Sequence, residues 1–305
     1  MDAVKLGTSD VMSSRIVYGC MRIVGDDSKD ARENGKQTVR GAIEEGYTHF
    51  DHADIYGGGK CEALFGEMLK ESPELREHIV ITSKCGIRGR GNPNESDPGR
   101  YDFSKGHIIK SVEGSLERLG IDCLDLFLLH RPDYLFEAEE VAEAFEDLHG
   151  AGKVAHFGVS NFRPSQVTLL QSSCPMPLLV NQVEINIHNI NTLMDGTLDQ
   201  CQELNITPQA WCPIGGVAYP AWGNTFSADD EVRIKAELDS QAEKYGAENW
   251  VVILAWLLKH PAKILPIIGT TKVARIRAAK QALEIPYSRE DWYRLLEVRN
   301  GNSVP

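Results

Sequence analysis

The chain has 305 residues, of which 42% are hydrophobic and 25% charged, a composition typical of a folded globular protein. Its 44 acidic residues and 32 Lys and Arg residues give a formal net charge of −12, which disfavours nucleic acid and anionic membranes as partners, because both are bound mainly through basic surfaces. The longest apolar stretch, residues 250–258, is shorter than the ~20 residues that span a bilayer, and the N-terminus lacks a signal-peptide pattern. We therefore expect a soluble, cytoplasmic protein.

The chain contains seven cysteines, an odd number, and no CxxC pair. This pattern fits neither a disulfide framework nor a zinc cluster. We expect the cysteines to be reduced and the protein to hold no metal. The sequence does not indicate the oligomeric state.

A short N-terminal hairpin is expected at Val4–Val11, and apolar β-rich runs then alternate with amphipathic helical patterns. Runs such as DLFLLH and ILPII are almost continuously apolar, as parallel strands covered on both faces are. Eight runs are predicted to be strands: Ile16–Cys20, Thr48–Asp51, Ile79–Lys84, Leu124–His130, Ala155–Ser160, Leu178–Glu184, Thr207–Trp211 and Ile264–Ile268. Eight such units predict a (β/α)8 barrel, which we expect to form one domain over residues 1–305.

Two long polar stretches, Gly86–Lys105 and Pro213–Asp230, follow the third and seventh predicted strands. In a barrel both would lie as long loops on the carboxyl-end face, where substrates bind. The chain has no GxGxxG fingerprint, P-loop, GxSxG elbow or HExxH helix. These absences remove the sequence support for Rossmann-type dinucleotide binding, for a serine hydrolase and for a zinc peptidase.

Polar side chains stand at the ends of three predicted strands: Asp51, Lys84 and His130, with Tyr56 five residues after Asp51. Strand ends converge in a barrel, so these residues are expected to meet. An ammonium beside a phenol stabilises phenolate, and Lys84 is therefore expected to lower the pKa of Tyr56 from its usual ~10. Tyr56 would then give and take a proton near neutral pH.

Around these four residues the chain resembles the aldo-keto reductase superfamily, and most closely its YdhF-like bacterial members. The motifs that carry this resemblance are FDHADIYG (50–57), ITSK (81–84), LLHRPD (128–133), GVSNF (158–162), NQVEIN (181–186) and PIIGTTKVARI (266–276). The resemblance implies an NAD(P)H-dependent carbonyl reductase in which Tyr56 is the general acid and Lys84 lowers its pKa. Asp51 would hold Lys84 in place, and His130 would orient the substrate carbonyl.

The resemblance also implies a cofactor pocket. Ser160, Asn161 and Gln182 would hold the nicotinamide carboxamide, and Trp211, where a Tyr is commoner, would stack on the ring. The other residues expected to line the nicotinamide and pyrophosphate are Gly19, Cys20, Met21, Cys212, Pro213, Ile214, Gly215 and Gly216.

The segment after the last predicted strand is expected to hold the cofactor's phosphate. Thr270 and Thr271 precede an amphipathic pattern, so a helix N-terminus favourable to anions is expected there, within a run rich in Lys and Arg. By resemblance, Thr270 and Arg275 would bind the 2′-phosphate of NADP, with Lys272 as a further candidate, which favours NADPH over NADH. The neighbouring Gly269 and Thr271 are also expected to contact the cofactor. Ala278 and Ala279 replace the family's usual adenine contacts.

Two other functions remain open at this point. The chain could be an NADP-binding regulatory or redox-sensing subunit with little turnover, although an intact set of four catalytic-type residues argues against it. A metal-dependent barrel hydrolase would need more His and Asp ligands at strand ends than Asp51 and His130. The sequence predicts a small-molecule carbonyl substrate without identifying it.

Overall fold

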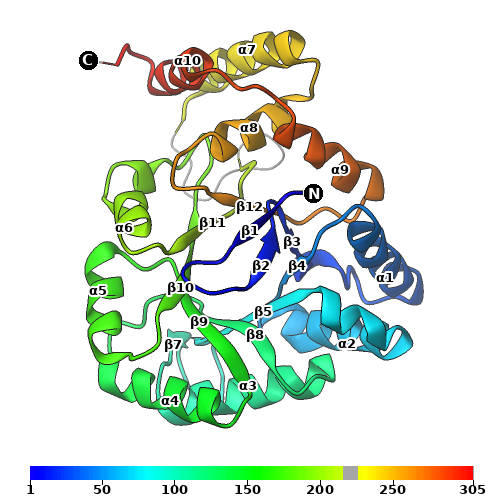
Figure 1. Ribbon diagram of the computed structural model, residues 1–305, viewed down its shortest axis with the longest axis vertical. Helices are drawn as coiled ribbons and strands as arrows, with labels where there is room; N and C mark the ends of the chain where they lie inside the picture. The colour runs from blue at the N-terminus through cyan, green and yellow to red at the C-terminus, as the bar shows by residue number, and fades with distance from the viewer. Residues whose placement is uncertain (216–225, 305) are drawn as a thin grey trace.

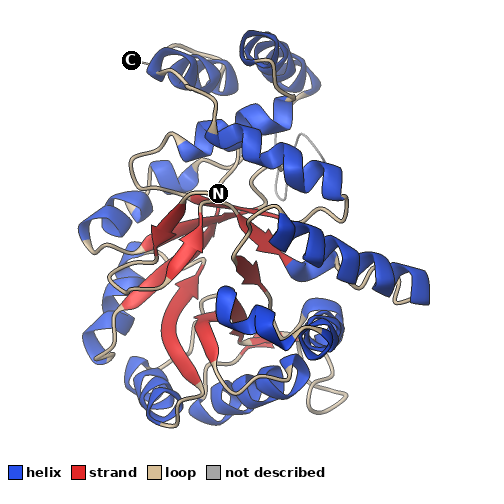
Figure 2. Cartoon of the chain, turned by 45° about the vertical axis from the view of Figure 1, so that its right-hand side comes forward, coloured by secondary structure: helices blue, strands red, loops and turns tan. Residues whose placement is uncertain are grey.

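The computed structural model describes residues 1–215 and 226–304. In this part of the chain eight parallel strands close a barrel in the order β10-β11-β12-β3-β4-β5-β8-β9 (Figures 1 and 2). The strands are β3 (Val17–Gly19), β4 (His49–Asp51), β5 (Val80–Cys85), β8 (Leu124–Leu129), β9 (Val154–Ser160), β10 (Leu178–Glu184), β11 (Thr207–Trp211) and β12 (Leu265–Ile268). Each overlaps one of the eight predicted runs and ends within one residue of it. The predicted (β/α)8 barrel is confirmed.

Helices alternate with the barrel strands and form its outer layer (Figure 2). They are α1 (Lys29–Glu44), α2 (Lys60–Glu71), α3 (Lys105–Leu119), α4 (Ala138–Gly150), α5 (Pro164–Ser173), α6 (Thr197–Glu203), α8 (Asn249–Leu258) and α9 (Val273–Ala279). Their apolar faces pack on the outer faces of the strands, as Phe145 of α4 does by stacking on Phe157 of β9 with ring centroids 4.0 Å apart. The main core therefore lies between the two layers.

Two helices lie outside this alternation, α7 (Ala228–Tyr245) and α10 (Arg289–Asn300), and they pack against each other (Figure 1, top). The helix α7 begins inside the predicted loop Pro213–Asp230, because Ser227 caps it: the Ser227 hydroxyl accepts from the amide of Asp230, whose carboxylate accepts from the amide of Ser227. The described part of that loop is therefore shorter at its C-terminal end than predicted.

The predicted N-terminal hairpin is present, and it closes the amino end of the barrel. Its strands are β1 (Ala3–Lys5) and β2 (Met12–Ser14), so it is longer than the predicted Val4–Val11. Leu6 lies in the turn of the hairpin and is fully buried among apolar side chains of the barrel interior such as Val17 and Leu126. Because the hairpin fills this end, the rim at the carboxyl ends of the strands is the one that is open to ligands.

The predicted loop Gly86–Lys105 contains a small antiparallel pair, β6 (Ile87–Arg88) and β7 (Arg100–Tyr101).

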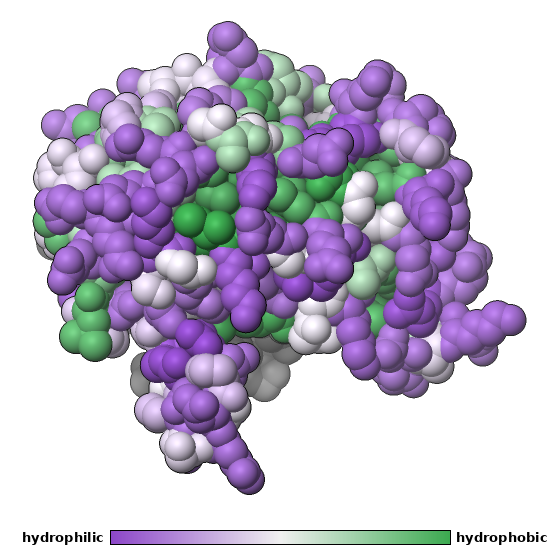
Figure 3. Space-filling view, turned by 90° about the horizontal axis from the view of Figure 1, so that it is seen from below, coloured by the Kyte–Doolittle hydropathy of each residue, from purple (hydrophilic) through white to green (hydrophobic). Residues whose placement is uncertain are grey.

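Hydrophilic residues cover most of the face drawn in Figure 3, with apolar side chains between them. Among the described residues there is no helix that combines the length and the apolar character needed to cross a bilayer.

Candidate active site

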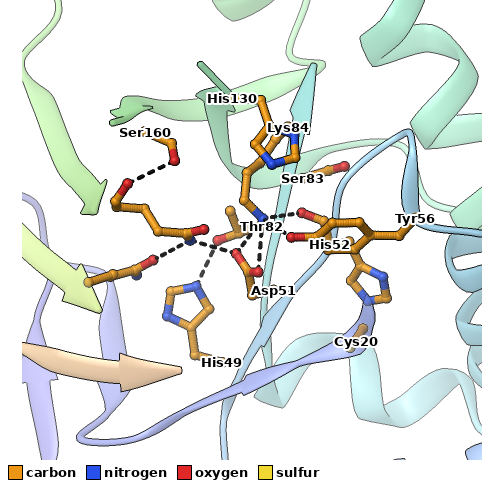
Figure 4. Close-up of polar contacts among 12 residues, drawn as sticks. Cys20, His49, Asp51, His52, Tyr56, Thr82, Ser83, Lys84, His130 and Ser160 are labelled. Atoms are coloured by element: carbon orange, nitrogen blue, oxygen red, sulfur yellow. Dashed lines mark hydrogen bonds and ion pairs between the residues drawn. The ribbon is translucent and has the colours of Figure 1, made fainter. Parts of the chain in front are cut away.

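Three neighbouring strands bring the four predicted catalytic residues together. Asp51 ends β4, Lys84 lies near the end of the adjacent β5, and His130 directly follows β8, which pairs with β5. Tyr56 begins the short 3₁₀ helix η2 (Tyr56–Gly59) in the loop after β4. Figure 4 shows the four side chains pointing toward one another at the carboxyl end of the barrel.

Lys84 is the centre of this cluster and is fully buried. Its Nζ donates to Oδ1 and Oδ2 of Asp51 at 2.7 and 2.8 Å, to the carbonyl oxygen of His52 at 2.6 Å and to the hydroxyl of Tyr56 at 3.3 Å (Figure 4). Burial disfavours the ammonium, but the attraction of Asp51 and the contact with Tyr56 outweigh it and raise the pKa of Lys84. The side chain is therefore a cation at neutral pH.

The pKa of Tyr56 differs from the expectation. Burial raises it above its usual value of 10, and Lys84 opposes this rise without reversing it. The lowering by the ammonium that the sequence predicted is present, but the loss of water around the phenol is the larger effect. Tyr56 is therefore a protonated phenol at neutral pH, which is the form that a proton donor needs.

His130 faces Tyr56 edge to face, with ring centroids 6.0 Å apart. Its Nδ1 is buried and has no hydrogen-bond partner among the described residues. Burial, together with the nearby charges of Lys84 and Arg131, holds the pKa of His130 well below 6.5. The imidazole is therefore neutral and has a nitrogen free for a further polar group.

The residues expected to hold the nicotinamide carboxamide form a chain of hydrogen bonds beside His130. Ser160 Oγ donates to the carbonyl oxygen of Gln182 at 2.8 Å, and Asn161 Nδ2 donates to the carbonyl oxygen of His130 at 3.2 Å. Asn161 adopts a left-handed conformation with φ of 61°, and its Oδ1 accepts from Trp211 Nε1 at 2.9 Å. The structure thus brings Ser160, Asn161 and Trp211 together on the rim next to His130.

Gln182 has a second set of contacts that the sequence did not predict. Its Nε2 donates to Asp51 Oδ1 at 2.8 Å and to Gln209 Oε1 at 3.0 Å, and both glutamines are buried. Gln182 and Gln209 are register partners on β10 and β11. A polar side chain in the middle of the predicted strand Thr207–Trp211 was the available signal for Gln209.

The remaining residues expected at the nicotinamide and pyrophosphate lie on two loops of the same rim. A tight turn follows β11 and contains Pro213 and Ile214; Cys212 has φ of 54°, and its carbonyl oxygen accepts from the amide of Gly215 at 3.0 Å. Gly216 lies outside the described residues. The other loop follows β3, which ends at Gly19. In this loop Cys20 is buried, whereas Met21 is 56% exposed.

The segment after β12 separates the cations of the basic run into two groups. Arg277 and Lys280 both form ion pairs with Glu45, whereas Lys272 and Arg275 are exposed and have no acidic partner within the described ranges. The Thr270 carbonyl accepts from Tyr18 Oη at 3.0 Å, and its hydroxyl accepts from the amide of Lys272 at 3.2 Å. Next to them, the Thr271 carbonyl accepts from the hydroxyl of Thr38 on α1. Lys272 and Arg275 are therefore available to an anion.

A second buried polar cluster, which the sequence did not predict, lies around Glu62, and Asp54 is close to Tyr56 in the chain. Glu62 of α2 is fully buried and accepts from Ser83 Oγ at 2.6 Å and from Arg118 Nε at 2.7 Å. Asp54, whose amide donates to the Lys84 carbonyl, has a buried Oδ1 without a partner among the described residues. Burial and the nearby charge of Glu62 raise the pKa of Asp54 to about 7.

The family model described as "Aldo/keto reductase family" matches residues 15–300. The chain belongs to this family. As an aldo/keto reductase it is an oxidoreductase, and members of the family use nicotinamide cofactors. The resemblance read from the sequence motifs is confirmed.

Individual relatives agree with this assignment. The chain is 45% identical over 293 residues to oxidoreductase YdhF of Escherichia coli (strain K12), covering 96% of this chain and 95% of that one. It is 40% identical over 304 residues to a 6-dehydroglucose reductase of Agrobacterium fabrum (strain C58), covering 98% and 99%. The crystal structure of the thermostable aldo-keto reductase Tm1743 with the inhibitor epalrestat superposes with a TM-score of 0.82 at 28% identity, covering 98% of this chain and 100% of that one.

Proposed function

We propose that this aldo/keto reductase reduces aldehyde or ketone groups of small molecules to alcohols with NADPH, and that Tyr56 donates the proton. The observation that carries this proposal is the contact of the buried Lys84 ammonium with both the Tyr56 hydroxyl and the Asp51 carboxylate. A lysine held in this way stabilises the phenolate that remains after the proton has left.

The roles of the other side chains follow from their protonation states. Tyr56 is protonated at neutral pH and gives its proton to the carbonyl oxygen as that oxygen becomes an alkoxide. Lys84 then faces the phenolate, and Asp51 keeps the ammonium in place. His130 is neutral, so its ring can donate a hydrogen bond to the carbonyl and orient it. The bound nicotinamide supplies the hydride.

The residues on the β9–β11 side of the rim fit a nicotinamide. Trp211 is half-buried and offers an indole ring for stacking, while Ser160 and Asn161 are polar groups held in fixed positions beside it. Gln182 is proposed as a carboxamide contact as well, although its Nε2 already donates to Asp51. Gly19, Cys20, Met21 and the 212–216 segment are proposed to line the rest of the dinucleotide.

We infer a preference for NADPH over NADH from the segment after β12. A 2′-phosphate needs cations that are not already neutralised, and Lys272 and Arg275 meet this condition whereas Arg277 and Lys280 do not. Thr270, with Gly269 and Thr271, is proposed to complete this phosphate site. Residues 1–305 are proposed to form one domain, which is supported by a family match that runs over almost the whole chain.

The test is an NADPH-oxidation screen over aldehydes, ketones and sugars, with NADPH binding measured separately by fluorescence titration. Because one relative is named 6-dehydroglucose reductase, the panel includes sugar aldehydes. We expect reduction of at least one carbonyl class. Tight NADPH binding without turnover on any of them would instead support the regulatory subunit that the sequence left open.

A further inference from the structure

An arginine lies on the rim of the barrel beside the carbonyl-binding groups. Arg131 directly follows His130, and its guanidinium carbon is 5.4 Å from the centroid of the Trp211 ring. Trp211 ends β11, and the strands β9 and β10 lie between β8 and β11 in the barrel. The side chain of Arg131 therefore reaches across one side of the same rim on which Tyr56 and His130 stand.

The charge of Arg131 is not neutralised by an acidic side chain in the described part of the protein. Residues 216–225, GVAYPAWGNT, contain no Asp or Glu that could supply a counter-charge. Two other arginines, on the loop after β5, are paired: Arg88 with Asp102, and Arg100 with Asp97. Arg131 is thus a half-buried cation without a carboxylate partner, in a protein that carries an excess of 12 negative charges.

The contact with Trp211 explains how Arg131 is held while its donors stay available. A cation–π contact orients a guanidinium without using a hydrogen-bond acceptor, so its N–H groups remain for a ligand. A guanidinium binds a carboxylate through two parallel hydrogen bonds, and this interaction is stronger where the cation is partly removed from water.

We propose that Arg131 determines substrate specificity by binding the carboxylate of a carboxylate-bearing aldehyde whose carbonyl lies at Tyr56 and His130. This proposal rests on the proposed function and narrows its substrate class. Arg131 is not one of the four catalytic-type residues, and it does not belong to the predicted cofactor pocket.

The experiment compares aldehydes that carry a carboxylate with uncharged aldehydes that have the same carbon chain or ring next to the carbonyl. One pair is 4-carboxybenzaldehyde and methyl 4-formylbenzoate, and a shorter pair is succinic semialdehyde and butanal. For at least one pair we expect kcat/KM of the wild type to be about 10- to 100-fold higher for the carboxylate, the range of a charge-assisted hydrogen-bonded pair. Arg131→Met is expected to remove this preference by slowing only the charged substrate, and Arg131→Lys to keep part of it.

Arg90→Met is the matched control, because it removes one exposed cation from the loop between β6 and β7 without touching Trp211. It should leave the preference intact. A wild type that treats both members of each pair alike within about threefold, or an Arg131→Met variant that keeps the preference, overturns the proposal.

Two further readouts separate this proposal from others. If Arg131→Met keeps the preference but weakens NADPH binding in a fluorescence titration, the cation serves a cofactor phosphate and the proposal is wrong. If no aldehyde is reduced at all, the proposed function has failed. In that case calorimetry with 4-(hydroxymethyl)benzoate and NADP⁺ tests the carboxylate site by itself. If the wild type binds this carboxylate and Arg131→Met does not, the site is supported; if the wild type does not bind it, the proposal is overturned.

Discussion

Gln182 and Asp51 meet across the interior of the barrel, where Gln182 Nε2 donates to Asp51 Oδ1 at 2.8 Å. Their strands, β10 and β4, are four steps apart in an eight-stranded ring and so stand on opposite sides. Asp51 thereby receives hydrogen bonds from Lys84 on one side and from Gln182 on the other. A side chain predicted only as a cofactor contact also fixes the carboxylate that holds the lysine.

Gln182→Met is expected to lower kcat about tenfold, since it removes a hydrogen bond to a buried charged group. It should also shift the pH profile. Activity falls as pH rises through the pKa of Tyr56, and the negative charge of Asp51 raises that pKa. Without the hydrogen bond from Gln182, the negative charge of Asp51 acts more strongly on Tyr56 and raises its pKa further. The falling limb of the pH profile should therefore move to higher pH.

The control for this change is Gln241→Met, which alters a buried glutamine on α7 that hydrogen-bonds to the Asp291 carbonyl and lies far from Asp51 in the sequence. It should change stability alone. A Gln182→Met enzyme with an unmoved falling limb and only a weaker affinity for NADPH would mean that Gln182 acts on the cofactor and not on Asp51.

Lys84→Met is expected to abolish activity and to destabilise the fold by about 3–5 kcal/mol, because it leaves the buried Asp51 carboxylate without its cation. Urea denaturation measures this loss. The double variant Asp51→Asn/Lys84→Met should recover much of the stability and none of the activity. Equal stability of the single and double variants would show that the ion pair is not what Lys84 contributes to the fold.

The stability of the protein should also depend on Asp54. Its pKa is raised from 3.8 to about 7 in the folded protein, so the neutral form stabilises the fold at low pH and this contribution is lost as pH rises through about 7. Asp54→Asn, which is neutral at every pH, should therefore raise Tm relative to the wild type more at pH 8 than at pH 5. A difference in Tm that is the same at both pH values would argue that Asp54 titrates normally.

Arg275→Ala is expected to weaken NADPH binding about tenfold or more while leaving NADH binding unchanged, because a charge-assisted contact contributes about 1.5–3 kcal/mol. Arg277→Ala removes the same charge from the same helix, but Arg277 is already paired with Glu45 and should have a much smaller effect. Fluorescence titration of both cofactors measures this. Equal losses in the two variants would contradict a 2′-phosphate site at Arg275.

The barrel was predictable because eight short β-rich runs, some of them almost continuously apolar, alternate with amphipathic helical patterns. The convergence of Asp51, Lys84 and His130 followed from this, since parallel strands end on one rim. The sign of the Tyr56 pKa shift did not follow. The sequence shows that a lysine is near, but only the packing shows how much water the phenol loses.

Pairings between side chains of distant segments could not be predicted from the sequence either. Nothing in the basic run separates Arg277 from Arg275, because the partner of Arg277 is Glu45 on another part of the chain. The link from Gln182 to Asp51 depends on which strands face each other across the closed barrel. The place of α10 against the barrel also depends on a tertiary contact, the stacking of Trp292 on Trp256 of α8.

The central claim is that Tyr56 supplies the proton for NADPH-dependent carbonyl reduction, and the Tyr56→Phe variant tests it most directly. The change deletes one hydroxyl and keeps the ring, so NADPH affinity should stay nearly unchanged. General acid catalysis typically contributes about 10²–10⁴-fold, and kcat on a good aldehyde substrate should fall by that factor. A Tyr56→Phe enzyme that retains kcat within about threefold of the wild type would contradict the account, because the proton would then come from another group.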